Sequence, residues 1–223
     1  QLGGIPSDLA IHPSGEIIVV TDRMRGQLHV LKLSDRSLKS LTTVKTVAQP
    51  AQVLIGPKGG SLAVSSTWDR RVAVYSMGEH NDRFQVRQQH SVEMPFALRE
   101  MLLFDDGGKL LIADAFGGNI AVLETETGSI LSQRRLPGHN IRGLALAQDK
   151  KEVLVSHQIL NPMARTTFND IHWGILMANV VRSIPIKTLN RPKADLLTGS
   201  RLYRLGTSGP AAGDPAGIAV GRT

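Results

Sequence analysis

A phrase that recurs about every 45 residues constrains the fold of this chain more than any other feature. Each copy contains a Pro or its counterpart, an apolar pair, a turn rich in Gly or Asp, and a short apolar strand. Pro6 and Pro50 are 44 residues apart, and the steps from Pro50 to Pro95 and from Pro95 to Asn140 are 45 residues each. A nearly constant period of this length indicates a repeat architecture.

Four short runs of alternating apolar and polar residues fill each repeat, and turns rich in Gly, Pro, Asp and Ser separate them. In the first repeat the second, third and fourth runs are 17–20, 27–33 and 37–43. Period-2 alternation predicts strands, and four short strands per repeat are typical of a β-propeller blade. A helical solenoid would show a 3.6-residue period, which is absent, and a β-sandwich is the weaker alternative. We therefore predict an all-β propeller of four-stranded antiparallel blades.

The predicted organisation is a single, partial propeller domain over residues 1–223. Each blade of a propeller buries its two faces against neighbouring blades, so the ring must close. We expect further blades, from the natural chain or from another subunit, to complete a ring of seven. The predicted blades are 3–48, 49–93, 94–138 and 139–213, with insertions at 158–172 and 187–200 and the start of a next blade at 214–223.

Composition excludes several classes of partner and site. The net charge is +7, but the basic residues are scattered and aromatics make up only 4%, so we expect no nucleic-acid partner. No apolar run approaches the roughly 20 residues of a membrane span. The absence of Cys excludes disulfides, thiolate metal sites and covalent haem attachment within these residues. No signal peptide is recognisable at the start.

The repeat phrases resemble the YVTN-type propeller repeats of bacterial surface and periplasmic proteins. The similarity rests on those phrases and on Gly-Asn-Ile-Ala-Val-Leu at 118–123, and it covers nearly all of the chain outside 158–200. The strand ending that names the family is looser here, as in Val-Val-Thr-Asp at 19–22. The resemblance implies a periplasmic or extracellular location and, commonly, seven blades.

Function is expected at the loops that follow the second strands. In a propeller these loops share one face with the connections between blades, and ligands commonly bind there. Three repeats place an Asp in these loops, which forms either part of a binding surface or a cap on the turn. The candidate residues are Asp22, Arg23, Asp69, Arg70 and Asp114.

The fourth repeat is about 30 residues too long, and insertions in repeat arrays gather on one face, often the binding face. Two His and an Asp suit a divalent metal or acid–base chemistry, although their spacing matches no metal motif. We predict a strand over 173–186, which includes Trp173; a helix over 168–183, capped by Thr167 and Asp170, is the alternative. The candidate residues are His157, Arg165, Asn169, Asp170 and His172, and the candidate metal ligands are His157, Asp170 and His172.

Two hypotheses about function follow. The first is a non-enzymatic scaffold or interaction domain, and we favour it. The segment 166–174 is similar to a stretch of bacterial propellers fused to di-haem peroxidase-like domains. That resemblance implies haem c in a c-type cytochrome domain outside this chain and no cofactor within it. The alternative is a metal-dependent propeller enzyme of the lactonase or quinoprotein kind. The apolar starts of the first strands, Leu9, Val53, Leu98 and Leu144, argue against it.

Overall fold

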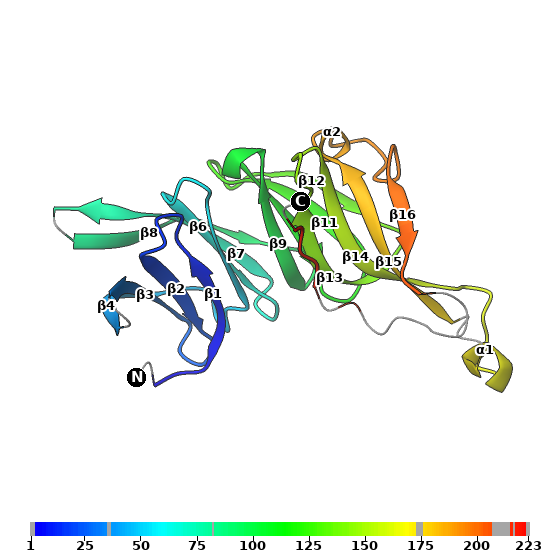
Figure 1. Ribbon diagram of the computed structural model, residues 1–223, viewed down its shortest axis with the longest axis horizontal. Coiled ribbons are helices and arrows are strands. Elements are labelled where there is room, and N and C mark those ends of the chain that lie inside the picture. The colour runs from blue at the N-terminus through cyan, green and yellow to red at the C-terminus, as the bar shows by residue number, and fades with distance from the viewer. Residues whose placement is uncertain are drawn as a thin grey trace. The chain divides into compact units, whose positions relative to one another are not determined.

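The computed structural model describes residues 3–34, 37–81, 83–172, 176–206, 215 and 217–221. Within these residues the chain forms four four-stranded antiparallel sheets, each built from four consecutive strands in chain order (Figure 1). The prediction of four-stranded blades is confirmed. Short turns connect neighbouring strands because Gly and Asn residues adopt the left-handed backbone that these turns require, as at Gly15 (φ 77°) and Gly59 (φ 77°).

The strands match the predicted runs and mostly extend them by a few residues. The first sheet contains β1 Pro6–Ile11, β2 Ile17–Asp22, β3 Gln27–Ser34 and β4 Ser37–Lys45. The second contains β5 Gln52–Ile55, β6 Ser61–Ser66, β7 Arg71–His80 and β8 Arg83–Glu93. The third contains β9 Leu98–Phe104, β10 Lys109–Asp114, β11 Asn119–Glu124 and β12 Ile130–Arg135, with a short 3-10 turn, η1, at Asp105–Gly107. The fourth contains β13 His139–Leu146, β14 Glu152–Leu160, β15 Met177–Pro185 and β16 Arg201–Arg204.

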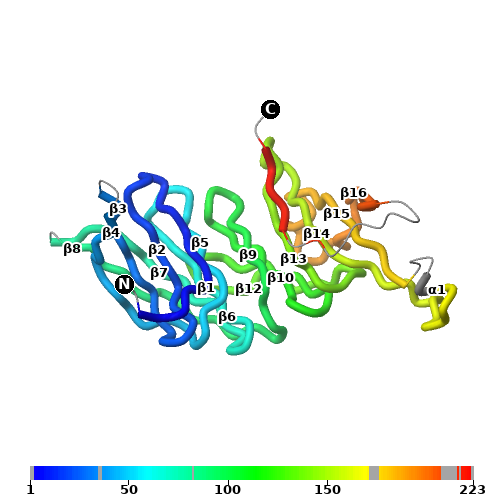
Figure 2. Tube along the Cα trace, turned by 60° about the horizontal axis from the view of Figure 1, so that its bottom comes forward, coloured from blue at the N-terminus to red at the C-terminus, as the bar shows by residue number. Residues whose placement is uncertain are grey.

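The chain divides into two compact units, which are described separately below. Unit 1 consists of Gln1–Leu111 and Leu123–Ile130, and unit 2 consists of Ile112–Val122 and Leu131–Thr223. Unit 1 therefore contains the first two sheets, and unit 2 contains the fourth. The Cα trace in Figure 2 follows the strands of both units in chain order.

The core of unit 1 lies between its first two sheets. Alternation places Val19, Leu28 and Val30 on the face that meets the second sheet, where Val64 and Tyr75 are buried. The Tyr75 hydroxyl lies 2.7 Å from Thr46 Oγ1, so the one polar group of this large side chain has a partner. Burial of apolar side chains on both strands of each pair is what holds one blade against the next.

Polar residues on the first strands add hydrogen bonds between neighbouring blades. The backbone N–H of Val53 donates to Asp8 Oδ2 at 2.8 Å, and that of Met101 donates to Gln52 Oε1 at 2.7 Å. Asp8 and Gln52 occupy the same register, opposite Thr21 and Ser65. The expectation that these strands present mainly apolar starts is therefore incomplete for the first two blades, because Leu9 and Val53 each follow a polar residue that bridges to the next blade.

The fourth sheet resolves the choice between strand and helix. The helix is confined to one turn, α1 at Phe168–His172, and the strand begins later than predicted, at Met177. Trp173 lies outside the described residues. A second short helix, α2 at Ile186–Leu189, opens the predicted second insertion, and residues 196–199 form a hydrogen-bonded turn.

The predicted start of a fifth blade is only partly described. Its described residues, 215 and 217–221, are not assigned to a strand, and Asp214 lies outside them. Ile218 nevertheless packs against β13. A Cβ atom on Gly143 would lie 2.9 Å from the backbone nitrogen and a methyl carbon of Ile218, so glycine is needed at this position for the two segments to approach.

Candidate functional site

In the first three sheets the turn after the second strand is capped by the last side chain of that strand. Asp22 accepts hydrogen bonds from the backbone N–H groups of Met24 at 3.0 Å and Arg25 at 3.1 Å. Asp114 accepts from the N–H of Phe116 at 3.0 Å, and its other oxygen accepts from the Asn119 amide. Both carboxylates are buried. Their main role is to fix the turn, as short polar side chains commonly do.

Burial alone would raise the pKa of Asp22, but hydrogen bonds from Arg25, Ile5, His29 and Met24 outweigh it and lower the pKa. The carboxylate is therefore ionised and held by its own turn. Arg25 adds an ion pair at 3.3 Å, and His29 Nε2 lies 3.6 Å from the same oxygen.

The register changes one of the sequence predictions. Asp22 pairs with Gln27, and Ser66 pairs in the same way with Arg71, so Ser66 is the counterpart of Asp22 and Asp114. Asp69 lies three residues further along, in the turn, where its N–H donates to Ser66 Oγ at 3.1 Å. Asp69 is exposed and 3.9 Å from Arg71, and Arg23 and Arg70 are exposed. The three predicted Asp residues are therefore not equivalent.

A large apolar side chain follows each cap by two residues and points into solvent. Met24, Trp68 and Phe116 are 68%, 63% and 58% exposed. Each belongs to a turn whose backbone is held by the Asp or Ser cap, so these residues are presented by pre-organised loops. Exposed large hydrophobic residues are individually ordinary, but their recurrence at one turn position in three blades is a pattern.

In the fourth blade an insertion replaces this turn and exposes further apolar residues. The N–H of Asp170 donates to Thr167 Oγ1 at 3.2 Å, as the predicted cap requires, and the N–H of Arg165 donates to Asp170 Oδ2 at 2.5 Å. These bonds hold α1 at the tip of the insertion, beyond the ends of β14 and β15 (Figure 1). Met163 is 84% exposed and Phe168 78%.

His157 occupies the fourth-blade position of the capping residues. Ser156 lies opposite Gly143 as Thr21 lies opposite Asp8, so the next residue, His157, corresponds to Asp22. Its side chain is fully buried; Nδ1 lies 3.2 Å from the Gln158 carbonyl oxygen, and Nε2 has no hydrogen-bond partner among the described residues. Burial lowers the pKa of His157 to about 4, helped by electrostatic interactions with Arg182 and His139 and opposed by the hydrogen bond to the Gln158 backbone. The imidazole is therefore neutral at pH 7.

The proposed metal ligands do not form a recognisable site. No group of three or more His, Asp or Glu side chains within the described part of the chain is arranged to hold a metal ion. His157 lies inside the sheet, whereas Asp170 folds back onto the backbone of its own loop. The side chain of His172 lies outside the described residues. Arg165 and Asn169 are exposed on the insertion.

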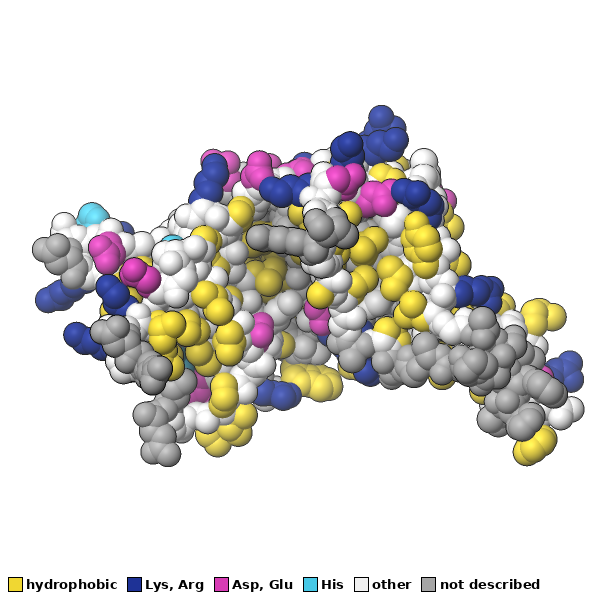
Figure 3. Space-filling model, viewed as in Figure 1, with side chains coloured by type: hydrophobic (Ala, Val, Ile, Leu, Met, Phe, Trp, Pro, Cys, Tyr) yellow, Lys and Arg dark blue, Asp and Glu magenta, His cyan; other side chains and the backbone are white. Residues whose placement is uncertain are grey.

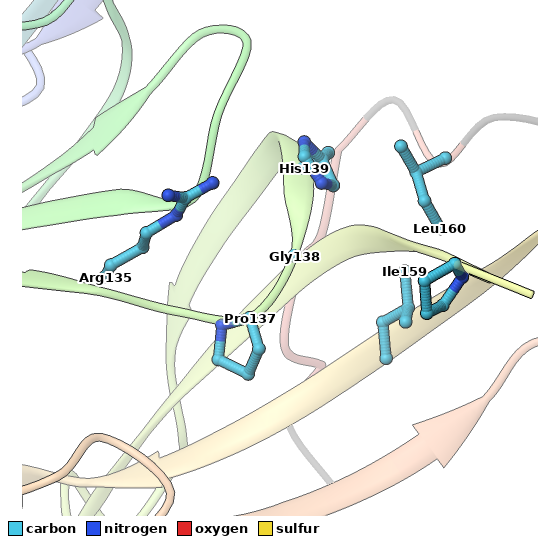
Figure 4. Close-up of a pocket in the computed structure, with 7 residues that line it drawn as sticks. Arg135, Pro137, Gly138, His139, Ile159 and Leu160 are labelled. Carbon is cyan, nitrogen blue, oxygen red and sulfur yellow. The ribbon is translucent and has the colours of Figure 1, made fainter.

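A cleft of about 620 Å³ opens in unit 2 beside the start of the insertion (Figure 4). One wall is the connection from β12 to β13, and the other is the end of β14. The two kinds of loop that were expected to share a face therefore do meet here. The lining residues are Arg135, Pro137, Gly138, His139, Ile159, Leu160 and Pro162.

Gly138 allows the cleft wall to lie directly over His157. A Cβ atom at this position would lie 2.4 Å from His157 Nδ1, closer than atoms can pack. Next to it, His139 pairs with Gln158 across the β13–β14 ladder, and the Asn140 amide donates to Gln158 Oε1 at 3.1 Å. This end of the cleft is therefore rigid backbone supported by a buried side chain.

Sequence reasoning selected the loops after the second strands, and the structure adds further residues to the candidates. Met24 and Phe116 could have been recognised by their constant offset from the capping residue. Arg135 and His139 were missed because they lie in a connection between blades, where the sequence shows only a turn with Pro and Gly. Their proximity to the end of β14 agrees with the expectation that these connections share a face with the loops after the second strands.

No family model and no curated protein matches the sequence, but many solved structures share its fold. A hydrazine synthase structure from Kuenenia stuttgartiensis has 18% identity and a TM-score of 0.73, covering 94% of this chain and 57% of that one. The periplasmic gluconolactonase PpgL of Pseudomonas aeruginosa has 17% identity and a TM-score of 0.56, with coverages of 72% and 51%. The β-propeller domain of Cps50 (Swd1) from Myceliophteria thermophila has 12% identity and a TM-score of 0.57, with coverages of 69% and 50%.

These similarities establish the fold class. The chain is built of β-propeller blades, and it spans little more than half the length of the solved structures it matches. Identities of 12% to 18% say nothing about substrate or partner. In the described residues no helix has the length and apolar character needed to cross a bilayer.

Proposed function

We propose that this chain is a non-catalytic propeller segment that acts as a scaffold and binds a protein partner through the turns that follow its second strands. The observation that carries the proposal is the recurrence of an exposed, pre-organised apolar residue in these turns. Aromatic residues and Met are enriched in the cores of protein interfaces, and rigid presentation lowers the entropic cost of binding. The wider insertion of the fourth blade adds Met163 and Phe168 to the surface of unit 2.

The proposal includes the setting of the domain. We propose a bacterial periplasmic or surface location because the repeat phrases resemble YVTN-type repeats. A c-type cytochrome domain elsewhere in the natural protein follows the short similarity at 166–174. Because the chain has no Cys, it cannot hold covalently attached haem itself. The propeller would then be the docking part of an electron-transfer protein.

Site-specific photo-crosslinking in the native host tests the interaction. A benzophenone amino acid is placed at Trp68 or Phe168, and control chains carry it at Lys58 or Ser14, which are exposed in the turns between first and second strands. We expect one discrete partner to crosslink from positions 68 and 168 and not from the controls. Equal crosslinking from all four positions, or none from 68 and 168, would overturn the proposal.

The enzymatic alternative has its own readout. A metal-dependent enzyme would hold a stoichiometric metal that is lost in the His157→Ala chain, and metal analysis of purified protein measures this. We expect no such metal, because His157 is buried without other ligands among the described residues. A bound metal that depends on His157 would favour the enzyme and count against the scaffold.

A further inference from the structure

We propose that the cleft between the β12–β13 connection and the end of β14 binds an extended peptide segment in which a carboxylate stands beside an aliphatic side chain. This inference rests on the proposed function, because it names the chemistry of the partner segment that would dock at the same end of unit 2. It draws on the charge, the apolar wall and the rigidity of the cleft.

The charge of the cleft is positive and unbalanced. Arg135 and His139 line it, and no Asp or Glu does. In Figure 4 the Arg135 side chain lies at one end of the lining, His139 lies between it and Leu160, and Ile159 and Leu160 lie at the other end. Arginine is suited to planar, bidentate recognition of a carboxylate.

Arg135 is available, whereas its neighbour Arg134 is not. The Arg134 guanidinium donates four hydrogen bonds to the carbonyl oxygens of Thr188, Leu189, Arg191 and Ala194, at 2.9 to 3.1 Å. Among the described residues Arg135 is exposed and makes no hydrogen bond or ion pair through its side chain. Two consecutive arginines therefore have different roles, one structural and one directed to solvent at the cleft.

The remaining walls are apolar and suit an aliphatic side chain. Pro137, Ile159 and Leu160 supply them, and Leu160 is half exposed. A volume of about 620 Å³ lies within the usual range of ligand clefts and accommodates a short segment. An apolar wall next to a guanidinium selects a ligand in which the acid and the apolar group are adjacent.

The cleft is pre-formed on its inner side. Gly138 is fixed over the buried His157, and His139 pairs with Gln158 beyond a register shift between His139 and Gly143. A rigid wall lowers the ordering cost of binding, so a short peptide can bind measurably. Extended backbone is also the conformation that fits between two strand ends.

The test uses the purified chain and two labelled peptides, acetyl-Gly-Leu-Asp-Leu-Gly-amide and its Asn counterpart, followed by fluorescence anisotropy. We expect the Asp peptide to bind about tenfold more tightly than the Asn peptide, as one charge-assisted contact implies. Arg135→Gln should abolish most of this difference, and His139→Gln should reduce it. Arg83→Gln removes an exposed arginine from the β7–β8 hairpin of unit 1 and should leave binding unchanged.

Three outcomes would overturn the inference. Equal binding of the Asp and Asn peptides would exclude carboxylate recognition. Octanoate binding as tightly as the peptide, and competing with it, would show a site for small acids instead. Failure of both peptides while Phe168 still crosslinks a partner would refute this cleft and leave the proposed function standing. Circular dichroism of the Arg135→Gln chain confirms that the variant is folded.

Discussion

At the scale of single residues, the positions that matter most are those where burial and charge conflict. His157 stands where Asp22 and Asp114 cap their turns, but the fourth blade has an insertion and no tight turn to cap. A carboxylate there would be buried without the backbone donors that stabilise the other two. A neutral imidazole is the less costly choice in such a place.

The low pKa of His157 predicts a loss of stability in acid. The unfolded chain takes up a proton near pH 6.5 and the folded chain only near pH 4, so stability falls as the pH decreases between these values. Between pH 7 and pH 5 we expect His157 to account for about 2 kcal/mol of this loss. Urea unfolding at both pH values measures it, and the His157→Gln chain should lose correspondingly less. Identical losses in the two chains would contradict the prediction.

Glu100 should have the opposite effect on stability over nearly the same pH range. Burial raises the pKa of Glu100 to about 7; the charge of Asp8 also raises it, and that of Arg99 lowers it. The folded chain keeps a proton that the unfolded chain loses near pH 4.5, so stability falls as the pH rises from about 4.5 to 7. We expect the urea midpoint of the Glu100→Gln chain to change less with pH over this interval. A steeper fall in the variant would show that Glu100 is ionised in the folded chain.

At the scale of elements, Arg134 organises the second insertion. Its guanidinium, on β12, binds the carbonyl groups at the end of α2 and in the turns that follow. The carbonyls of Thr188 and Arg191 also accept backbone N–H groups, from Arg191 and Ala194, so the guanidinium adds to the few bonds that a four-residue helix and its turns make for themselves. The Arg134 guanidinium therefore stabilises the loop that follows α2.

Replacing Arg134 should loosen residues 188–198 without unfolding the blade. Met keeps much of the apolar stem but donates no hydrogen bond, so amide exchange in this segment should accelerate by about tenfold or more. Arg135→Met is the matched control, since its guanidinium has no such bonds. Hydrogen exchange followed by mass spectrometry measures both chains. Equal protection of 188–198 in the two variants would show that the clamp is dispensable.

The elements also show how far sequence reasoning reaches. The strands were predictable because alternation and turn residues repeat with a constant period. In each repeat the second strand begins just after the turn of the recurring phrase. These strands are β2, β6, β10 and β14, which begin at Ile17, Ser61, Lys109 and Glu152. The insertion was harder, because local capping signals at Thr167 favoured a helix while the blade required a strand, and both are present in succession. The meeting of the β12–β13 connection with the end of β14 was expected, but the residues that line the cleft were not predicted.

At the scale of the whole molecule, the outer face of the first sheet resembles an interface that lacks its partner. Alternation directs Ala10 and Val19 toward the second sheet and leaves Leu9 and Ile11, 58% and 60% exposed, on the other side. Figure 3 shows hydrophobic side chains gathered over β1 and β2. In a repeat array a terminal face of this kind requires capping, so we propose that another blade covers it.

This proposal predicts self-association of the isolated chain. Leu9→Asp and Ile11→Asp should each shift the sedimentation profile at micromolar concentration toward the monomer, because charge on this face opposes its burial. Leu38→Asp, which changes an exposed residue of β4, is the control and should shift it less. If the unchanged chain is monomeric and stays soluble, the apolar face does not need to be buried by another blade.

The proposed mode of binding can be judged from one affinity. The partner captured from position 68 is titrated against three chains: the unchanged chain, Trp68→Ala and Leu38→Ala. Leu38 is the control residue, because it is apolar and similarly exposed but lies outside the turns. Buried Trp residues dominate interface energies, so Trp68→Ala should weaken binding by about tenfold or more while Leu38→Ala leaves it unchanged. Equal affinities for all three chains, or equal losses in the two variants, would show that the turns after the second strands are not where the partner binds.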